Sequence, residues 1–285
     1  MVQFRYRALL LLISFGLGAV SAAWADWRFD AETGALYENN LSESDRAADE
    51  ESDWAWKSDV RAGYGLQLSR DLRLNLASDI AGEVWDQFSD FDNIDLGTSA
   101  GLRYRFGLGR QAPWILAEDR LAYQFFNEDV RNGWNNDFRI TGGLAMTDRL
   151  SIEAGYLFDH FAARDNFFDL EGQNGSIRLI YDVNPSLQIA LGYNYRYGDA
   201  ISYAVPPRPD ILKISDAERE DITSFGSEHY TAYRLQASTH SVFVSAGYAV
   251  NRFMSIEVSY EYANTSHDPL VYENHLVEAK VRLAY

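Results

Sequence analysis

Hydrophobic and polar residues alternate along most of this chain, most clearly over 241–262. Val242 and Val244 occupy alternate positions, and Ser241 and Ser245 lie on either side of the pair. After Asn251 and Arg252 the alternation resumes, with apolar and aromatic residues again on one parity. A period of two predicts a strand with one apolar and one polar face. Two such strands joined by a tight turn predict an antiparallel hairpin.

The same pattern recurs and predicts about twelve strands, each about 10–14 residues long, which suits tilted crossings of a membrane. One strand is imperfect, because Asp119 falls on its apolar parity, and we expect a bulge or a shifted boundary there. The expected strands are 27–39, 54–68, 72–85, 94–108, 114–126, 137–146, 150–161, 175–183, 187–198, two strands that contain 241–262, and 272–285.

The predicted connections alternate in length. A tight turn follows every even-numbered strand, and a longer polar loop follows every odd-numbered strand. The longer loops include 41–53, 199–230 and 264–271. Membrane barrels have short turns at one end and long loops at the other. The alternative is a soluble β-sandwich or barrel whose apolar parity forms the core.

Composition narrows the class further. The 285 residues include no cysteine, so a disulfide framework and thiolate metal sites are excluded. The mean hydropathy of −0.30 is too polar for a bundle of membrane helices. Beyond the N-terminus the chain has no apolar run long enough for a transmembrane helix.

The first 25 residues have the pattern of a secretory signal peptide. Arg5 and Arg7 precede an apolar stretch over 8–20, and Ala-Trp-Ala at 23–25 fits a cleavage site. We therefore expect residues 1–25 to be removed and 26–285 to form a single domain. The alternative is a retained anchor helix.

The final strand ends V-E-A-K-V-R-L-A-Y, with Val281, Leu283 and Tyr285 on one parity. This ending resembles the C-terminal signal that the barrel-assembly machinery reads in outer-membrane β-barrels of Gram-negative bacteria, although the last residue there is usually Phe or Trp. From Asp26 onward the chain is similar to that class and is porin-like. The resemblance implies an all-β, single antiparallel transmembrane barrel with short periplasmic turns, long extracellular loops and both termini periplasmic. It also implies contact with outer-membrane lipid and lipopolysaccharide.

The parity that would face the lumen is rich in ionic residues of both signs. The near balance places most of the net charge of −17 in the loops. The candidate pore-lining residues are Asp59, Arg61, Arg73, Asp79, Asp95, Arg103, Arg105, Glu118, Arg120, Arg139, Glu153, Arg178, Arg196, Glu257, Glu261, Glu278, Lys280 and Arg282.

Two interpretations of this lumen remain open. Opposed acidic and basic faces can line a passive channel that selects small polar solutes by charge. Alternatively, the same side chains pair across a narrow lumen and plug it, since twelve strands lie between filled and open barrels. A plugged barrel would act structurally or through surface interactions of its acidic loops. The near balance of charge argues against a porin dedicated to polyanionic sugars.

The acidic loops and the histidines offer further chemistry. Loops 41–53 and 199–230 can bind divalent cations that bridge to lipopolysaccharide, or can form a solvated rim. A rim hydrolase acting on lipid A or protein would use Asp159, His160, His229 and His267. The chain has no G-x-S-x-G, H-E-x-x-H, 12-residue calcium-loop or phosphate-binding glycine-loop motif and no basic patch for nucleic acid, so we expect a non-enzymatic protein without a cofactor.

Overall fold

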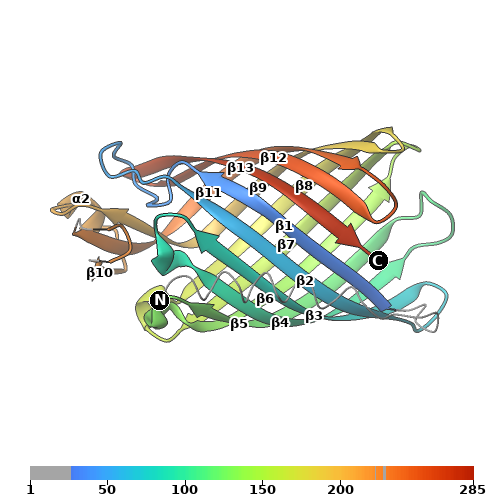
Figure 1. The fold of residues 1–285 in the computed structure, drawn as a ribbon, viewed down its shortest axis with the longest axis horizontal. Coiled ribbons are helices and arrows are strands. Elements are labelled where there is room, and N and C mark those ends of the chain that lie inside the picture. The colour runs from blue at the N-terminus through green and yellow to red at the C-terminus, as the bar shows by residue number, and fades with distance from the viewer. Residues whose placement is uncertain (1–26, 222, 227–228) are drawn as a thin grey trace.

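A computed structural model of the chain describes residues 27–221, 223–226 and 229–285. Twelve long strands form one antiparallel barrel, and a short strand, β10 (Ala217–Asp221), lies beyond one end (Figure 1). The predicted all-β barrel of about twelve strands is confirmed. The predicted signal peptide, 1–25, lies outside the described residues. The barrel strands are β1 (Trp27–Glu38), β2 (Asp53–Gln67), β3 (Leu72–Trp85), β4 (Asn93–Arg105), β5 (Trp114–Phe126), β6 (Gly133–Ala145), β7 (Leu150–Ala163), β8 (Leu170–Asn184), β9 (Leu187–Ala204), β11 (Tyr230–Ala249), β12 (Met254–His267) and β13 (Leu270–Ala284).

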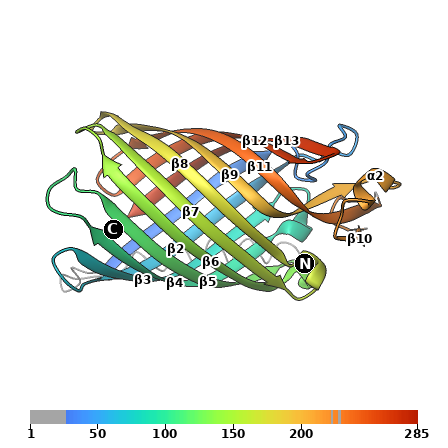
Figure 2. The ribbon, with the colours of Figure 1, turned by 180° about the vertical axis from the view of Figure 1, so that it is seen from behind.

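The barrel is closed by two pairings between strands distant in sequence. β1 pairs with β13 as well as with β2, and β11 pairs with β9 as well as with β12. Each barrel strand therefore has two hydrogen-bonded neighbours, which satisfies the backbone without an open edge. The strands run at a slant around the cylinder, as Figures 1 and 2 show from opposite sides.

The two ends of the barrel differ. The turn end is the end of the short connections, where the first residues of β1 pair with the last residues of β13. The loop end carries the longest connections. The turn end is formed by 68–71, 106–113, 146–149, 185–186 and 250–253, and the loop end by 39–52, 86–92, 127–132, 164–169, 205–229 and 268–269.

The predicted alternation of connection lengths is wrong at two places. The predicted loop over 264–271 is a two-residue link, 268–269, because the ladder between β12 and β13 continues to the pair His267 and Leu270. The turn at 106–113 has eight residues, because β4 ends at Arg105 rather than at 108.

The longest predicted loop is also partly strand. β9 extends to Ala204 and pairs along its whole extension with β11, so the connection begins at 205 instead of 199. The connection contains a single helical turn, α2 (Pro209–Leu212), and the strand β10. No helix among the described residues is long and apolar enough to cross a membrane.

The predicted bulge at Asp119 is wrong. Asp119 lies opposite Ala100 on one side and Phe138 on the other, within registers that run without a break. The pleat is therefore regular, and the Asp119 side chain lies on the outer face. Its carboxylate accepts a hydrogen bond from the Asn136 amide across 3.0 Å, which satisfies part of its polarity.

The outer face of the barrel is apolar and exposed. Its middle carries side chains such as Val60, Leu96 and Val258, each about half exposed. Aromatic pairs lie on this face near both ends, with Trp27 and Tyr64 at the turn end. A wide exposed apolar band between aromatic residues is the surface of a protein that sits in a bilayer.

Candidate functional site

Among the described residues, three cavities lie against the inward faces of the strands. The turn-end chamber has a volume of about 690 Å³, the middle chamber about 230 Å³ and the far chamber about 440 Å³. Fifteen of the eighteen predicted pore-lining residues line these chambers. The remaining three, Asp79, Arg120 and Arg196, take part in ion pairs along the wall.

The turn-end chamber is lined by β1 to β5 near their turn ends, together with Arg282 of β13. Gly63 and Gly65 of β2 and Gly101 of β4 form part of the inner wall. A Cβ at Gly65 would collide with the Arg73 guanidinium, so this glycine makes room for the arginine. The predicted residues that line the chamber are Asp59, Arg61, Arg73, Arg103, Arg105, Glu118 and Arg282.

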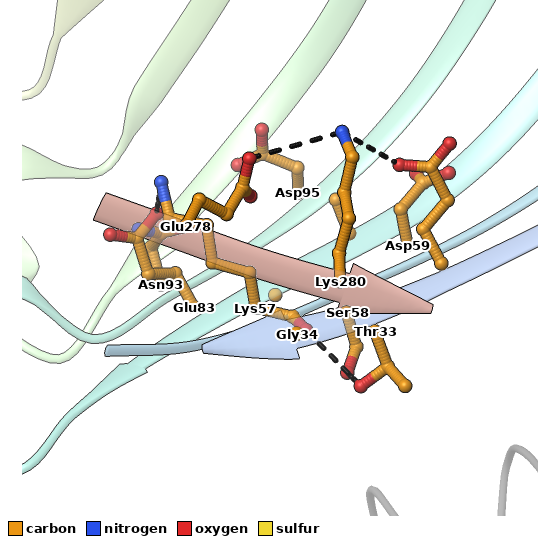
Figure 3. Close-up of a pocket in the computed structure, with 13 residues that line it drawn as sticks. Thr33, Gly34, Lys57, Ser58, Asp59, Glu83, Asn93, Asp95, Glu278 and Lys280 are labelled. Atoms are coloured by element: carbon orange, nitrogen blue, oxygen red, sulfur yellow. Dashed lines mark hydrogen bonds and ion pairs between the residues drawn. The ribbon is translucent and has the colours of Figure 1, made fainter. Parts of the chain in front are cut away.

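The middle chamber is smaller and has more acidic than basic residues. Lys280 of β13 lies 3.4 Å from Glu32 of β1 and 3.9 Å from Glu278. Figure 3 shows Lys280 and Glu278 on one side of the sheet, whereas Thr33 and Ser58 lie on the other. The predicted residues that line this chamber are Asp59, Asp95, Glu278 and Lys280.

The far chamber lies against the opposite wall, formed by β6 to β9 and β11 to β13. Arg178 lies over the ring of Phe243, 4.9 Å from its centre, which fixes the guanidinium against the wall. The predicted residues that line this chamber are Arg139, Glu153, Arg178, Glu257, Glu261, Glu278 and Lys280.

A network of ion pairs links β3, β4, β5 and β6 across the inner wall. Arg120 of β5 donates to Asp79 of β3 across 2.5 Å, and its guanidinium also lies 3.9 Å from Asp95 and 4.0 Å from Asp137. The Asp79 side chain is only 6% exposed. This network fills part of the lumen cross-section with side chains that are held in place.

Adjacent chambers share lining residues. Glu32 and Asp59 line both the turn-end and the middle chamber, and Glu278 and Lys280 line both the middle and the far chamber. The chambers are therefore separated by single side chains rather than by layers of backbone. Two carboxylates, Glu32 and Asp59, form the first boundary, and a carboxylate and an ammonium group, Glu278 and Lys280, form the second.

The loop end is covered by a hydrophobic cap. Phe88, Phe168 and Phe225 come from three different connections and pack with Tyr203 and Tyr230 of the extended hairpin of β9 and β11. Connections that are far apart in sequence thus meet in one cluster. The cap contrasts with a set of independent solvated loops.

Buried charges hold the cap together. Arg208 makes two hydrogen bonds to Asp45 of the first loop, of 2.7 and 2.9 Å, and its side chain is 1% exposed. Its hydrogen bonds to Asp210 lower the pKa of that carboxyl to about 2. Arg131 pairs with Glu128 across 2.6 Å. The long connection is thereby fixed to the first loop.

Two acidic residues of the first loop, Glu43 and Glu51, accept hydrogen bonds from tyrosines of the barrel strands. Tyr272 donates to Glu43 across 2.7 Å, and Tyr230 donates to Glu51 across 2.9 Å. Burial raises the pKa of Glu43, an effect that the Tyr272 hydroxyl partly offsets. Among the described residues, no group of three or more metal-binding side chains is placed to hold an ion. Cation bridging to lipopolysaccharide stays a prediction.

The residues of the rim-hydrolase alternative are not assembled into a site. Asp159 faces the lumen and accepts from Arg196 across 3.1 Å, whereas its neighbour His160 lies on the outer face, 3.9 Å from Glu171. The His267 ring bonds to the backbone carbonyl of Gln236. His229 is exposed at the loop end.

Some charged lumen residues were missed by the sequence interpretation. Asp30 and Glu32 of β1 both contact Arg282, at 2.9 and 3.3 Å. Arg28 lines the same chamber. The alternation of β1 was the available signal, because these residues occupy the parity opposite Trp27 and Phe29. Arg131 and Arg208 had no such signal, since they lie in connections.

The chain is similar in structure to solved outer-membrane channels and porins. An outer-membrane channel from Pseudomonas putida F1 is 10% identical with a TM-score of 0.61, and the alignment covers 95% of this chain and 98% of that chain. The NanC porin is 10% identical with a TM-score of 0.46, covering 90% and 98%. The KdgM porin in complex with disordered oligogalacturonate is 13% identical with a TM-score of 0.42, covering 90% and 99%.

The likeness to the channel from Pseudomonas putida F1 shows the fold. The chain has the closed antiparallel fold of an outer-membrane β-barrel. No protein-family model matches the chain. No curated protein sequence matches it.

Proposed function

We propose that this protein is a passive channel for small polar solutes in the outer membrane of a Gram-negative bacterium. Its lumen is lined by acidic and basic side chains, and three cavities lie against its walls and share charged lining residues. These cavities with shared charged lining residues are the observation that carries the proposal. Charged walls select solutes by charge and dipole. The fold shared with an outer-membrane channel is consistent with it.

In this proposal the turn end and both termini face the periplasm, and the cap lies outside the cell. The predicted assembly residues Val281, Leu283 and Tyr285 are at the end of β13 that this orientation places in the periplasm. There they would meet the assembly machinery after removal of residues 1–25. The protein acts without a cofactor and without enzymatic activity.

The test is single-channel recording of the folded protein in a planar bilayer under a salt gradient. We expect steady openings, with a reversal potential that shifts toward anion preference in Asp59→Asn. Asp59 lies at the boundary of two chambers, so its charge acts on ions that cross there. Asp148→Asn, in an exposed turn, is the matched control and should leave the potential unchanged.

A closed barrel with a structural or surface role is the second candidate, and the packed cap favours it. Heat-modifiable migration in gels verifies the fold of each sample. A correctly folded protein that stays silent in the bilayer would reject the channel. If the protein conducts but its reversal potential is the same in Asp59→Asn, ions do not pass through these chambers.

A further inference from the structure

The overall balance of charge in the lumen conceals a separation along it. The turn-end chamber is lined by seven arginines and five carboxylates. The middle chamber has two lysines and five carboxylates, and the far chamber has three basic and four acidic residues. Basic charge is therefore in excess only at the turn end. The potential in that chamber favours anions, because low-dielectric walls focus the field of the arginines.

Most of these arginines lack an acidic partner. Arg61 pairs with Glu118 across 3.5 Å, and Arg282 pairs with Asp30 and Glu32. The other five form no ion pair with any described residue. They are Arg28, Arg70, Arg73, Arg103 and Arg105. Their positive charges are therefore not neutralised by a carboxylate of the described residues.

The strand register places two of these arginines directly opposite one another. Arg73 of β3 faces Arg103 of β4. Like charges opposite each other on neighbouring strands destabilise a sheet. The two arginines of the far chamber face carboxylates instead, because Arg139 faces Glu118 of the turn-end chamber and Arg178 faces Glu153. The pairing of two arginines is thus a local feature of the turn-end chamber, and a bound anion would relieve its repulsion.

Neighbouring residues hold the two guanidinium groups and leave space before them. Arg103 lies over the ring of Trp114 at 4.4 Å, which leaves the N–H groups at its edge available. Arg73 lies over Gly65 and bonds to Asn75 across 3.1 Å. Both positions are adjacent to the cavity of about 690 Å³, which Arg70 and Asp71 extend to the turn end.

We propose that this chamber is a binding site for a small organic anion with two or more carboxylate or phosphate groups. A guanidinium group binds such a group through two parallel hydrogen bonds. Arg73 and Arg103 would share one anionic group, and Arg105, two positions farther along β4, would bind a second. The acidic middle chamber would repel a long polyanion, so the ligand is small and is held at the turn end.

Equilibrium dialysis of radiolabelled citrate tests the site with the folded protein in detergent micelles. We expect saturable binding that weakens with added salt. Arg73→Gln with Arg103→Gln should lower the affinity about tenfold or more, because two charge-assisted contacts are lost. The matched control, Arg139→Gln with Arg178→Gln, removes equal charge from the far chamber and should change the affinity less than about twofold.

Competition identifies the chemical class. If inorganic phosphate displaces citrate, the site accepts both carboxylate and phosphate groups. If citrate binds and phosphate does not displace it, the ligand is a carboxylate. Binding of phosphate alone restricts it to phosphate compounds. Acetate, with one carboxylate, should compete weakly.

The absence of saturable citrate and phosphate binding by the folded protein would overturn the proposal. Equal losses in the two double variants would also overturn it. If the Arg73 and Arg103 variant does not fold, Arg105→Gln replaces it and should lower the affinity about threefold or more, and an unchanged affinity would overturn the proposal. Binding in micelles does not require conduction, so this result is independent of the proposed channel.

Discussion

Arg120 donates a 2.5 Å hydrogen bond to Asp79 across the inner face of β4, although the two residues are 41 positions apart. Gly97 of β4 lies between them, and a Cβ at this glycine would meet both side chains. The pair therefore requires a glycine on the intervening strand. It joins β3 to β5 independently of the backbone ladder.

Removing Arg120 should destabilise the barrel more than removing the charge of Asp79. Arg120→Met leaves Asp79, Asp95 and Asp137 close together without their shared cation, so we expect a loss of about 3 kcal/mol in the free energy of unfolding. Asp79→Asn should cause a smaller loss, because Arg120 keeps two carboxylates nearby. Urea unfolding in lipid vesicles measures both. The double variant completes the cycle, and additive losses would show that the pair is not coupled.

The cap should open when its central buried charge is removed. Arg208→Met breaks the bonds to Asp45 and Asp210, and we expect docking to weaken by about 3 kcal/mol. Protease cleavage within 205–229 should then be roughly 100-fold faster. Arg46→Met, at an exposed position of the first loop, should leave the rate unchanged. Equal protection in Arg208→Met would show that the hydrophobic cluster alone holds the cap.

Docking of the first loop should depend on pH in two opposite ways. Burial raises the pKa of Glu43. At a pH above the ordinary pKa of a carboxyl group, the docked state therefore binds a proton that the undocked state does not bind. Docking therefore strengthens as the pH falls from neutral through that window. Asp210, with a pKa of about 2, stays ionised in the docked state, and its contribution is lost as the pH falls from its ordinary range toward 2.

Amide hydrogen exchange in 39–52, corrected for its intrinsic pH dependence, measures this behaviour. We expect exchange to slow from pH 7 toward about pH 5 and to accelerate below about pH 3. Glu43→Gln should remove the first effect and keep the second, because glutamine is neutral at every pH. Slower exchange on acidification in Glu43→Gln would assign the effect to another group.

The carboxylate of Asp119 on the outer face should lower the stability of the barrel in a bilayer. Asp119→Leu should raise the free energy of unfolding in vesicles by about 1 kcal/mol, because a charged group there opposes insertion. Glu118→Leu, one position away on the inner face, should lower it, because Arg61 loses its partner. Lower stability in Asp119→Leu would indicate that another protein covers this position in the membrane.

The order of the strands, and the face on which each of their side chains lies, follow from the sequence alone. Alternation has a period of two, and the pleat turns that period into inner and outer faces without further information. Asp59, Arg103 and Glu257 lie on the inner face for this reason. The misplaced boundary at 264–271 arose because polar residues such as Asn264 and Ser266 resemble a loop, although the β12 and β13 ladder continues through them.

Which charged residues pair with one another depends on the closed barrel and could not be predicted from the sequence. Ion pairs across strands depend on register and curvature, and these brought Arg120 to Asp79 and placed Arg73 opposite Arg103. The cap was decided in the same way, since Arg208 and Asp45 lie in connections whose sequence has no periodicity. Periodic patterns encode the direction of a side chain relative to its own strand, whereas contacts between distant segments arise only when the closed sheet fixes their positions.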